Sequence, residues 1–251
     1  MPELPISEEN LLRPQSPYAI SKVQADYLMR GYHNIYGLKA IVSRSFNTEG
    51  AGRGNMFVTS IIAKQVMKLK LKESSKVLIG NVNAFRDWSH IDDIVKGYCL
   101  LAEKGNAGEV YNQGSMRTNS VLSYILLALE SAGWRVEKIE TINETNRKTV
   151  LDPLQRNNDE MFGLSFDKTN VDQLLLTDEL EFALEDEGIW VYTDKGKIPI
   201  EFDSRRFRPA EVPILLSDTR KIRQLGFEVS HKLGDIIKDE LNFYLKPSGR
   251  F

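Results

Sequence analysis

The stretch SPYAISK, residues 16–22, and the run KAIVSRSF, residues 39–46, decide the fold of this chain. Ser16 can cap backbone N–H groups and Pro17 fits the first helical turn, so they predict a helix that ends before Gly37. The β-branched residues of the second run predict a strand. A glycine-rich segment, NTEGAGRGN at residues 47–55, and a helical pattern over residues 56–71 follow. This alternation indicates an α/β fold.

The same alternation continues further along the chain. Apolar runs predict strands at residues 77–79, 109–112 and 135–142, and amphipathic periodicity predicts helices at residues 91–104, 120–132, 218–224 and 233–245. The tripeptide DKG at residues 194–196 predicts a hairpin. Residues 140–205 carry 16 acidic and seven basic side chains, which sets them apart as an acidic insert. Its densest part, residues 178–187, is interpreted as a solvated helix face.

Composition excludes several classes of protein. The 251 residues are 41% hydrophobic and 27% charged, with a net charge of −2, so we expect a folded core and no surplus of basic groups for nucleic acid. Cys99 is the only cysteine, which excludes a disulfide framework within the chain and fits a reducing cytoplasm. The sequence has no long apolar run and no positively charged, apolar amino terminus, so neither a membrane span nor a signal peptide is predicted.

Tyr18 and Lys22 are the first candidates for catalysis. They stand four residues apart on the predicted helix, so their side chains share one face. An ammonium group beside a phenol favours the phenolate, and a phenolate can exchange a proton with a sugar hydroxyl. The pair alone is weak evidence, because ordinary exposed helix pairs have the same spacing.

The surroundings of this pair resemble the extended branch of the short-chain dehydrogenase/reductase superfamily, whose catalytic signature is Tyr-x-x-x-Lys. FNTEGAGRGNMFVTS, residues 46–60, is similar to the part of its nucleotide-sugar enzymes in which an asparagine holds the diphosphate side of the substrate. The resemblance assigns that role to Asn47, and it places Arg53 in a loop over cofactor phosphate or a neighbouring subunit. IGNVNAFRDWSHIDDIV, residues 79–95, resembles the next block and assigns Arg86 to substrate phosphate or ribose.

Several titratable residues lie at the start of the predicted helix at residues 91–104. We expect Asp87, Asp92 and Asp93 to cap and orient this helix, because negative charge is favourable at a helix amino terminus. His90 has no histidine or cysteine near it in the sequence. A structural role is therefore expected for His90, and no metal site is predicted.

RRFRPAEVPILLSD, residues 205–218, resembles the R-P-A-E-V block with which GDP-mannose enzymes hold their nucleotide. The resemblance assigns Arg208 to the diphosphate and Glu211 to the ribose hydroxyls, whereas Arg205 and Arg206 are expected in a solvated loop. With RDWSH and MFVTS, this block makes the GDP-mannose 4,6-dehydratase family the nearest resemblance. GAGRG and VPILLSD are also similar to segments of GDP-4-dehydro-6-deoxy-mannose reductases.

The resemblance implies the carboxyl-terminal half of an extended Rossmann-type, doubly wound α/β domain at residues 1–48 and 82–114. It implies a small mixed α/β domain that binds the sugar nucleotide at residues 49–81 and 115–251. NADP is the implied cofactor and a GDP-sugar the implied ligand. In the complete reaction, Tyr18 takes the C4 hydroxyl proton while NADP accepts hydride, and Lys22 supports the phenolate and the nicotinamide ribose. Water leaves across C5–C6, and the hydride returns to C6.

The family pattern is incomplete in this sequence. The family's glycine-rich dinucleotide loop, its Ser/Thr catalytic partner and its acidic base for elimination, all upstream of the tyrosine, have no counterpart here. We therefore expect the isolated chain to be inactive as a dehydratase, and the alternative is a truncated GDP-sugar-binding module without chemistry. A sheet without its first strands exposes an edge, so a homo-oligomer or a complementary amino-terminal half is the expected partner.

Overall fold

The computed structural model describes residues 3–207 and 212–245, and the chain divides into two compact units. Unit 1 comprises Met1–Thr48, Asp87–Arg117 and Leu215–His231. Unit 2 comprises Glu49–Arg86, Thr118–Ile214 and Lys232–Phe251. The division proposed from the sequence differs from these units at three places. It put residues 82–86 in the Rossmann-type half and residues 115–117 and 215–231 in the sugar-nucleotide domain, whereas residues 82–86 belong to unit 2 and the other two segments to unit 1. Residues 215–231 join unit 1 because Ile222 and Phe227 pack against Leu101 and Tyr111 in its core.

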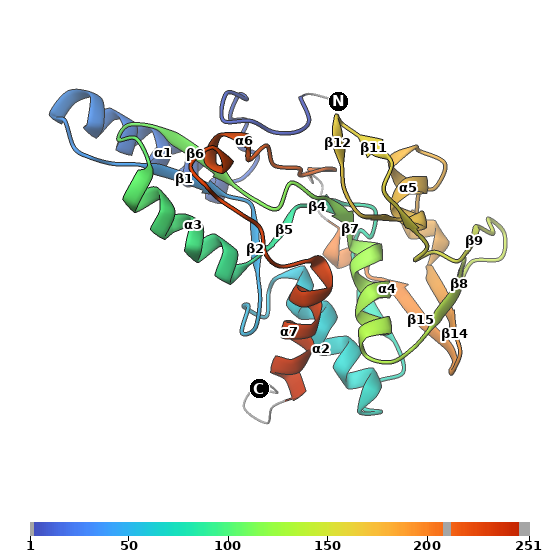
Figure 1. Cartoon of the computed structure of the whole chain (residues 1–251). Coiled ribbons are helices and arrows are strands. Elements are labelled where there is room, and N and C mark those ends of the chain that lie inside the picture. The colour runs from blue at the N-terminus through green and yellow to red at the C-terminus, as the bar shows by residue number, and fades with distance from the viewer. Residues whose placement is uncertain (1–2, 208–211, 246–251) are drawn as a thin grey trace. The chain divides into compact units, whose positions relative to one another are not determined.

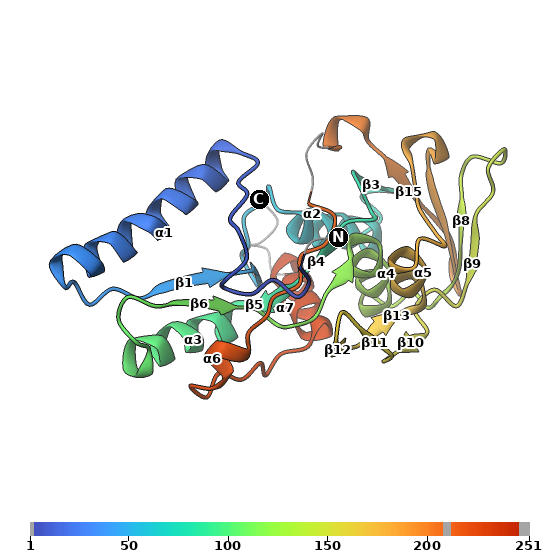
Figure 2. The ribbon, with the colours of Figure 1, turned by 90° about the horizontal axis from the view of Figure 1, so that it is seen from above.

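Unit 1 is built around a parallel strand pair (Figure 1). β1 (Val42–Ser45) runs parallel to β6 (Val110–Gln113), with Val42 opposite Val110. α1 (Pro17–Tyr36) lies on one side of the pair, and α3 (Ile91–Lys104) and the short α6 (Arg220–Arg223) lie on the other (Figure 2). β2 (Asn47–Glu49) pairs with β5 (Trp88–His90), so three residues expected in a loop form a strand.

The first helix begins and ends as its sequence predicts. The Ser16 side chain accepts a hydrogen bond from the backbone N–H of Ala19, and Pro17 occupies the first turn. Gly37 follows the last helical residue with a φ of 69°, a left-handed conformation that favours glycine. The predicted first helix is therefore confirmed at both of its ends.

Unit 2 contains a five-stranded sheet in the order β3-β15-β14-β8-β9. Its strands are antiparallel neighbours except for β15 and β3, which run parallel. The predicted hairpin is confirmed as β14 and β15, with Thr193 opposite Gly196. The strands of this sheet are β3 (Val77–Ile79), β8 (Val136–Thr141), β9 (Thr149–Leu151), β14 (Gly188–Thr193) and β15 (Gly196–Phe202).

Three helices of unit 2 pack together: α2 (Val58–Lys70) and α4 (Val121–Ser131) each contact α7 (Leu233–Leu245) (Figure 1). Every residue from 121 to 129 in α4 is buried, so this helix lies at the centre of the unit. The other elements of unit 2 are β4 (Phe85–Arg86), β7 (Asn119–Ser120), β10 (Arg156–Asn157), β11 (Glu160–Met161), β12 (Leu164–Ser165), β13 (Lys168–Thr169) and α5 (Asn170–Leu176). Short 3₁₀ turns lie at Leu184–Asp186 and Ser204–Arg206.

The prediction of a solvated helix face at residues 178–187 is wrong about the helix, although most of the acidic side chains there are exposed as predicted. This stretch forms turns and the short 3₁₀ turn at Leu184–Asp186. Phe182 is 3% exposed, and the buried carboxylate of Asp186 accepts from Lys148 Nζ at 2.6 Å. The half-buried Lys148 thus holds one acid of the run inside, whereas the other acidic side chains of the run are exposed. None of the helices in the described residues combines the length and the apolar character needed to cross a membrane.

Candidate active site

Tyr18 and Lys22 lie together on the first turns of α1. Lys22 Nζ is 5.4 Å from the centre of the Tyr18 ring. Tyr18 is 72% exposed and Lys22 is also exposed, so both polar ends are open to a ligand. The Ser16 cap fixes where the helix starts, and it thereby fixes the face on which the two side chains stand. The structure thus brings together the phenol and the ammonium group that the sequence paired.

Asn47 is the first residue of β2, directly after the loop that follows β1. Its Oδ1 atom is buried and has no hydrogen-bond partner among the described residues. A buried polar atom without a partner is costly. Several side-chain atoms of the described residues share this property, and Asn47 Oδ1 is the one that belongs to a residue predicted to hold substrate.

Arg86 lies in β4, which pairs with β7, and is half-buried. Its Nη1 donates at 2.7 Å to the carbonyl oxygens of Phe85 and Val212. It thereby holds the chain directly after residues 208–211. Arg208 and Glu211, the predicted nucleotide contacts, lie outside the described residues.

Arg53 sits over a buried acidic group in unit 2. Its guanidinium carbon is 3.5 Å from the centre of the Phe57 ring, and its Nε is 3.2 Å from Glu49 Oε2. Thr59 donates to the same oxygen of Glu49 at 2.7 Å. Burial raises the pKa of Glu49, although the hydrogen bonds and the charge of Arg53 oppose the shift. Arg53 is thus anchored at one end by packing and charge within its own unit.

A second buried carboxyl, Glu240 on α7, lies near Glu49. Burial and then the charge of Glu49 raise the pKa of Glu240 to about 8. Tyr124 donates a hydrogen bond to Glu240 Oε2 at 2.9 Å, and this pairing also raises the pKa of Tyr124, after the effect of its own burial. Two carboxyls so close together in a low-dielectric interior cannot both ionise cheaply. No sequence motif marked Glu240, because its partners come from α2 and α4.

The prediction that Asp87 caps α3 is wrong. Asp87 is fully buried, and its carboxylate accepts from the backbone and side chain of both Ser115 and Ser217. Burial raises the pKa of Asp87 despite these hydrogen bonds. His90 is the residue that caps α3, through a side-chain nitrogen that accepts from the backbone N–H of Asp92. Sequence reasoning missed Ser115 and Ser217, because they reach Asp87 from 28 and 130 residues away.

The predicted site residues are thus divided between the two units. Tyr18, Lys22 and Asn47 belong to unit 1, and Arg53 and Arg86 belong to unit 2. Unit 1 by itself can supply a phenol that exchanges a proton and an ammonium group beside it, and unit 2 by itself carries guanidinium groups of a kind suited to phosphate.

Comparison with known proteins identifies relatives along most of the chain. A family model described as GDP-mannose 4,6 dehydratase matches residues 1–175. GDP-mannose 4,6-dehydratase from Sinorhizobium fredii (strain HH103) is 26% identical over 246 residues, which cover 96% of this chain and 58% of that protein. GDP-6-deoxy-D-mannose reductase from Pseudomonas aeruginosa is 30% identical over 138 residues, which cover 55% of this chain and 45% of that protein. The chain spans about half the length of the curated relatives it matches.

A solved structure gives the corresponding likeness in three dimensions. The structure of RMD from Pseudomonas aeruginosa complexed with NADPH matches with a TM-score of 0.67 at 20% identity, over 96% of this chain and 60% of that chain. Likeness at this identity shows the fold, and the fold is of the Rossmann-type, doubly wound α/β class predicted above. With the family model matched over residues 1–175, the chain belongs to the GDP-mannose 4,6-dehydratase family of extended short-chain dehydrogenases/reductases.

Proposed function

We propose that this chain supplies the substrate-side part of a GDP-mannose 4,6-dehydratase, which converts GDP-mannose to GDP-4-dehydro-6-deoxy-mannose. The observation that carries the proposal is the Tyr18–Lys22 pair, open to ligand on the first turns of α1. Tyr18 would accept the proton of the sugar C4 hydroxyl, and Lys22 would favour the phenolate form that accepts it. Asn47 would place its unpartnered Oδ1 against the substrate.

A nicotinamide cofactor belongs to this proposal, and we infer that it is NADP. The relative solved in complex with NADPH supports a cofactor of this class. The exposed ends of Tyr18 and Lys22 fit the ribose of a nicotinamide nucleotide, because both can make hydrogen bonds to hydroxyl groups. When bound, the cofactor supplies the hydride acceptor. A strand followed by G-x-x-G-x-x-G is not found in this sequence, so its diphosphate would need residues from outside the 251 given.

The first experiment tests whether the cofactor needs residues beyond the 251 given. The pure 251-residue chain, incubated with GDP-mannose and NADP, is expected to give no 4-keto product. Formation of that product by the chain alone would contradict the proposed need for further cofactor-binding residues.

The second experiment tests the nucleotide groove by calorimetric titration with GDP. Arg208→Ala is expected to weaken binding about tenfold or more, because a hydrogen bond to a charged group contributes about 1.5–3 kcal/mol. Arg205→Ala is the matched control: Arg205 is an exposed arginine three residues away whose guanidinium already pairs with Asp203 at 2.9 Å. Equal affinities for the parent chain and the Arg208 variant would refute the assigned role.

Two alternative functions, a reductase and a binding module without chemistry, make different experimental predictions. The 30% identity to a GDP-6-deoxy-D-mannose reductase favours a reductase of the 4-keto sugar as the second candidate. Supplying GDP-4-dehydro-6-deoxy-mannose and NADPH to the chain together with its cofactor-binding part would distinguish the reductase by NADPH consumption. A module that binds GDP-sugar without chemistry would bind GDP in the titration above and show neither reaction.

A further inference from the structure

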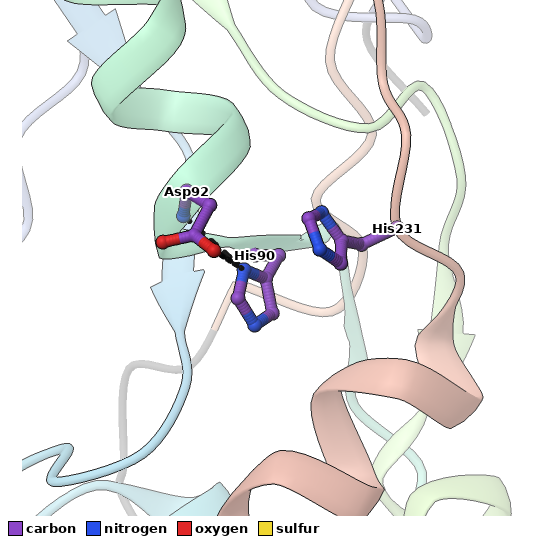
Figure 3. A group of neighbouring side chains, drawn as sticks. All are labelled: His90, Asp92 and His231. Atoms are coloured by element: carbon purple, nitrogen blue, oxygen red, sulfur yellow. Dashed lines mark hydrogen bonds and ion pairs between the residues drawn. The ribbon is translucent and has the colours of Figure 1, made fainter.

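The amino-terminal end of α3 carries a cluster of side chains that the proposed function does not use. His90, Asp92 and His231 each offer one ligand atom, and these atoms lie within 4.8 Å of one another (Figure 3). His90 and Asp92 come from the start of α3, and His231 reaches them from the segment before α7. All three belong to unit 1. Although 141 residues separate His90 from His231 in the sequence, their rings stack with centroids 4.0 Å apart.

We propose that His90, Asp92 and His231 form a binding site for a divalent transition metal ion such as Zn²⁺. Two imidazoles and one carboxylate are a ligand set that zinc takes in proteins, with a fourth position left for water. The site lies at the surface: the side chain of Asp92 is 65% exposed and that of His231 is 28% exposed. An ion can therefore enter from solvent without opening the core.

The distances are those of an open site that closes on an ion. His90 Nδ1 lies 3.7 Å from Asp92 Oδ2. Ligand atoms about 2.0–2.1 Å from a tetrahedral ion would lie about 3.3 Å from one another. The exposed Asp92 side chain can make this adjustment by rotation. His90 Nδ1 accepts a hydrogen bond from the Asp92 backbone N–H at 3.2 Å, so this nitrogen carries a lone pair, and an ion bound to it would replace the bond that caps α3.

Asp93 supports the second histidine in the way that outer ligands support metal sites. His231 Nδ1 lies 3.0 Å from Asp93 Oδ1, so this nitrogen donates its proton to the carboxylate and Nε2 carries the lone pair. The buried Asp93 also accepts from Ser230 Oγ and from the backbone N–H of His231. Lys96 Nζ lies 3.8 Å from the same Asp93 oxygen, so its charge is directed at the supporting carboxylate. These contacts orient the His231 ring, which must tilt out of its stack on His90 for the lone pairs of both rings to meet at one ion.

The test is a titration of the chain, prepared without a histidine tag, with Zn²⁺ by calorimetry and with Co²⁺ by visible absorption. We expect one ion per chain and a rise in melting temperature that a chelator reverses, because binding to the folded state alone stabilises it. Asp92→Asn changes an exposed side chain and preserves its shape. It and His231→Gln are each expected to weaken Zn²⁺ binding by at least about 100-fold, more than the roughly 10–100-fold loss expected for the outer ligand change Asp93→Asn.

Two control variants remove the other imidazole and the thiol of the chain, which could also bind a transition metal ion. The sequence contains three histidines and one cysteine, so His33→Gln and Cys99→Ser remove the other imidazole and the exposed thiol. Both variants should bind Zn²⁺ and Co²⁺ as the parent does. Absence of 1:1 binding in the parent chain, or binding that survives in Asp92→Asn and His231→Gln but is lost in Cys99→Ser, would overturn the proposal.

Discussion

α1 and α4 are helices of one chain with opposite degrees of burial. In the 20-residue α1, Asp26 is the buried residue, whereas residues 121–129 of the 11-residue α4 are all buried. α1 is not poor in apolar side chains, because Leu28 is 51% exposed and Ile35 is 72% exposed. A helix in a folded chain can thus carry an apolar surface that its own unit does not cover. Such a surface is typical of an interaction site, so a second copy of the chain is the partner to test first.

The largest effect expected from this difference is association of the chain through α1. Covering a few hundred Å² of apolar surface contributes about 10 kcal/mol at roughly 25 cal/mol per Å². Light scattering at micromolar concentration should therefore give a mass above 28.6 kDa. The double substitution Leu28→Lys with Tyr32→Lys, on one face of α1, should return the mass to that of a monomer. Leu151→Lys, at an exposed position of β9, is the control and should leave the parent mass unchanged. A well-folded monomeric parent would contradict this inference.

The next effect compares leucines of the two helices directly. Leu126 is 0% exposed in α4, so Leu126→Ala should lower the free energy of unfolding by about 2–5 kcal/mol through lost burial and a residual cavity. Leu28→Ala in α1 should change it by less than about 0.5 kcal/mol in a chain kept dilute enough to be monomeric. Urea denaturation measures both. Equal losses would show that α1 is packed against its own unit more tightly than the exposure of Leu28 indicates.

The smallest expected effect concerns the buried acids of the two units. Burial would raise the pKa of Asp26, but hydrogen bonds and charge from Arg44 and Arg30 outweigh it and lower that pKa. Burial and the charge of Glu49 instead raise the pKa of Glu240 to about 8. Asp26 should therefore stabilise the fold at neutral pH. This effect should be lost as pH falls below the ordinary pKa range of an aspartate towards the lowered pKa of Asp26. Glu240 should destabilise the fold progressively as pH rises from about 4.5 to about 8, because the folded state binds its proton more tightly.

Denaturation at several pH values separates the two acids. Asp26→Asn should cost about 1.5–3 kcal/mol near neutral pH, and the cost should shrink as pH falls below the ordinary pKa range of an aspartate. Glu240→Gln should remove the decline between pH 4.5 and 8 and stabilise the chain at pH 8 by on the order of 3 kcal/mol. A parent chain whose stability is flat across that range would contradict the raised pKa of Glu240.

Sequence reasoning predicted the elements whose signals are local. α3 and α7 have the predicted bounds, and α1 has its predicted cap, because helical periodicity and capping depend on residues a few positions apart. It predicted the Tyr18–Lys22 pair for the same reason. It did not predict β10 to β13, because strands of two residues carry no periodic signal.

The contacts that sequence reasoning missed join residues far apart in the chain. His90 carries no mark of its partner, since His231 is placed beside it by the packing of unit 1. Asp87 looks like a helix cap by position, but folding brings two serines to it and leaves the cap to His90. Pairings of this kind depend on the whole topology and can be known only from the folded chain.

The Asp87 carboxylate also has a consequence for how the protein is made. Its two serine partners leave the ribosome 28 and 130 residues after it, so an ionisable group meant for the interior stays in water for most of translation. Closing so long a loop costs entropy before any contact repays it, which slows folding relative to locally connected topologies. The buried cluster around Asp87 in unit 1 therefore cannot be completed until Ser217 has been synthesised, although α1 is synthesised much earlier.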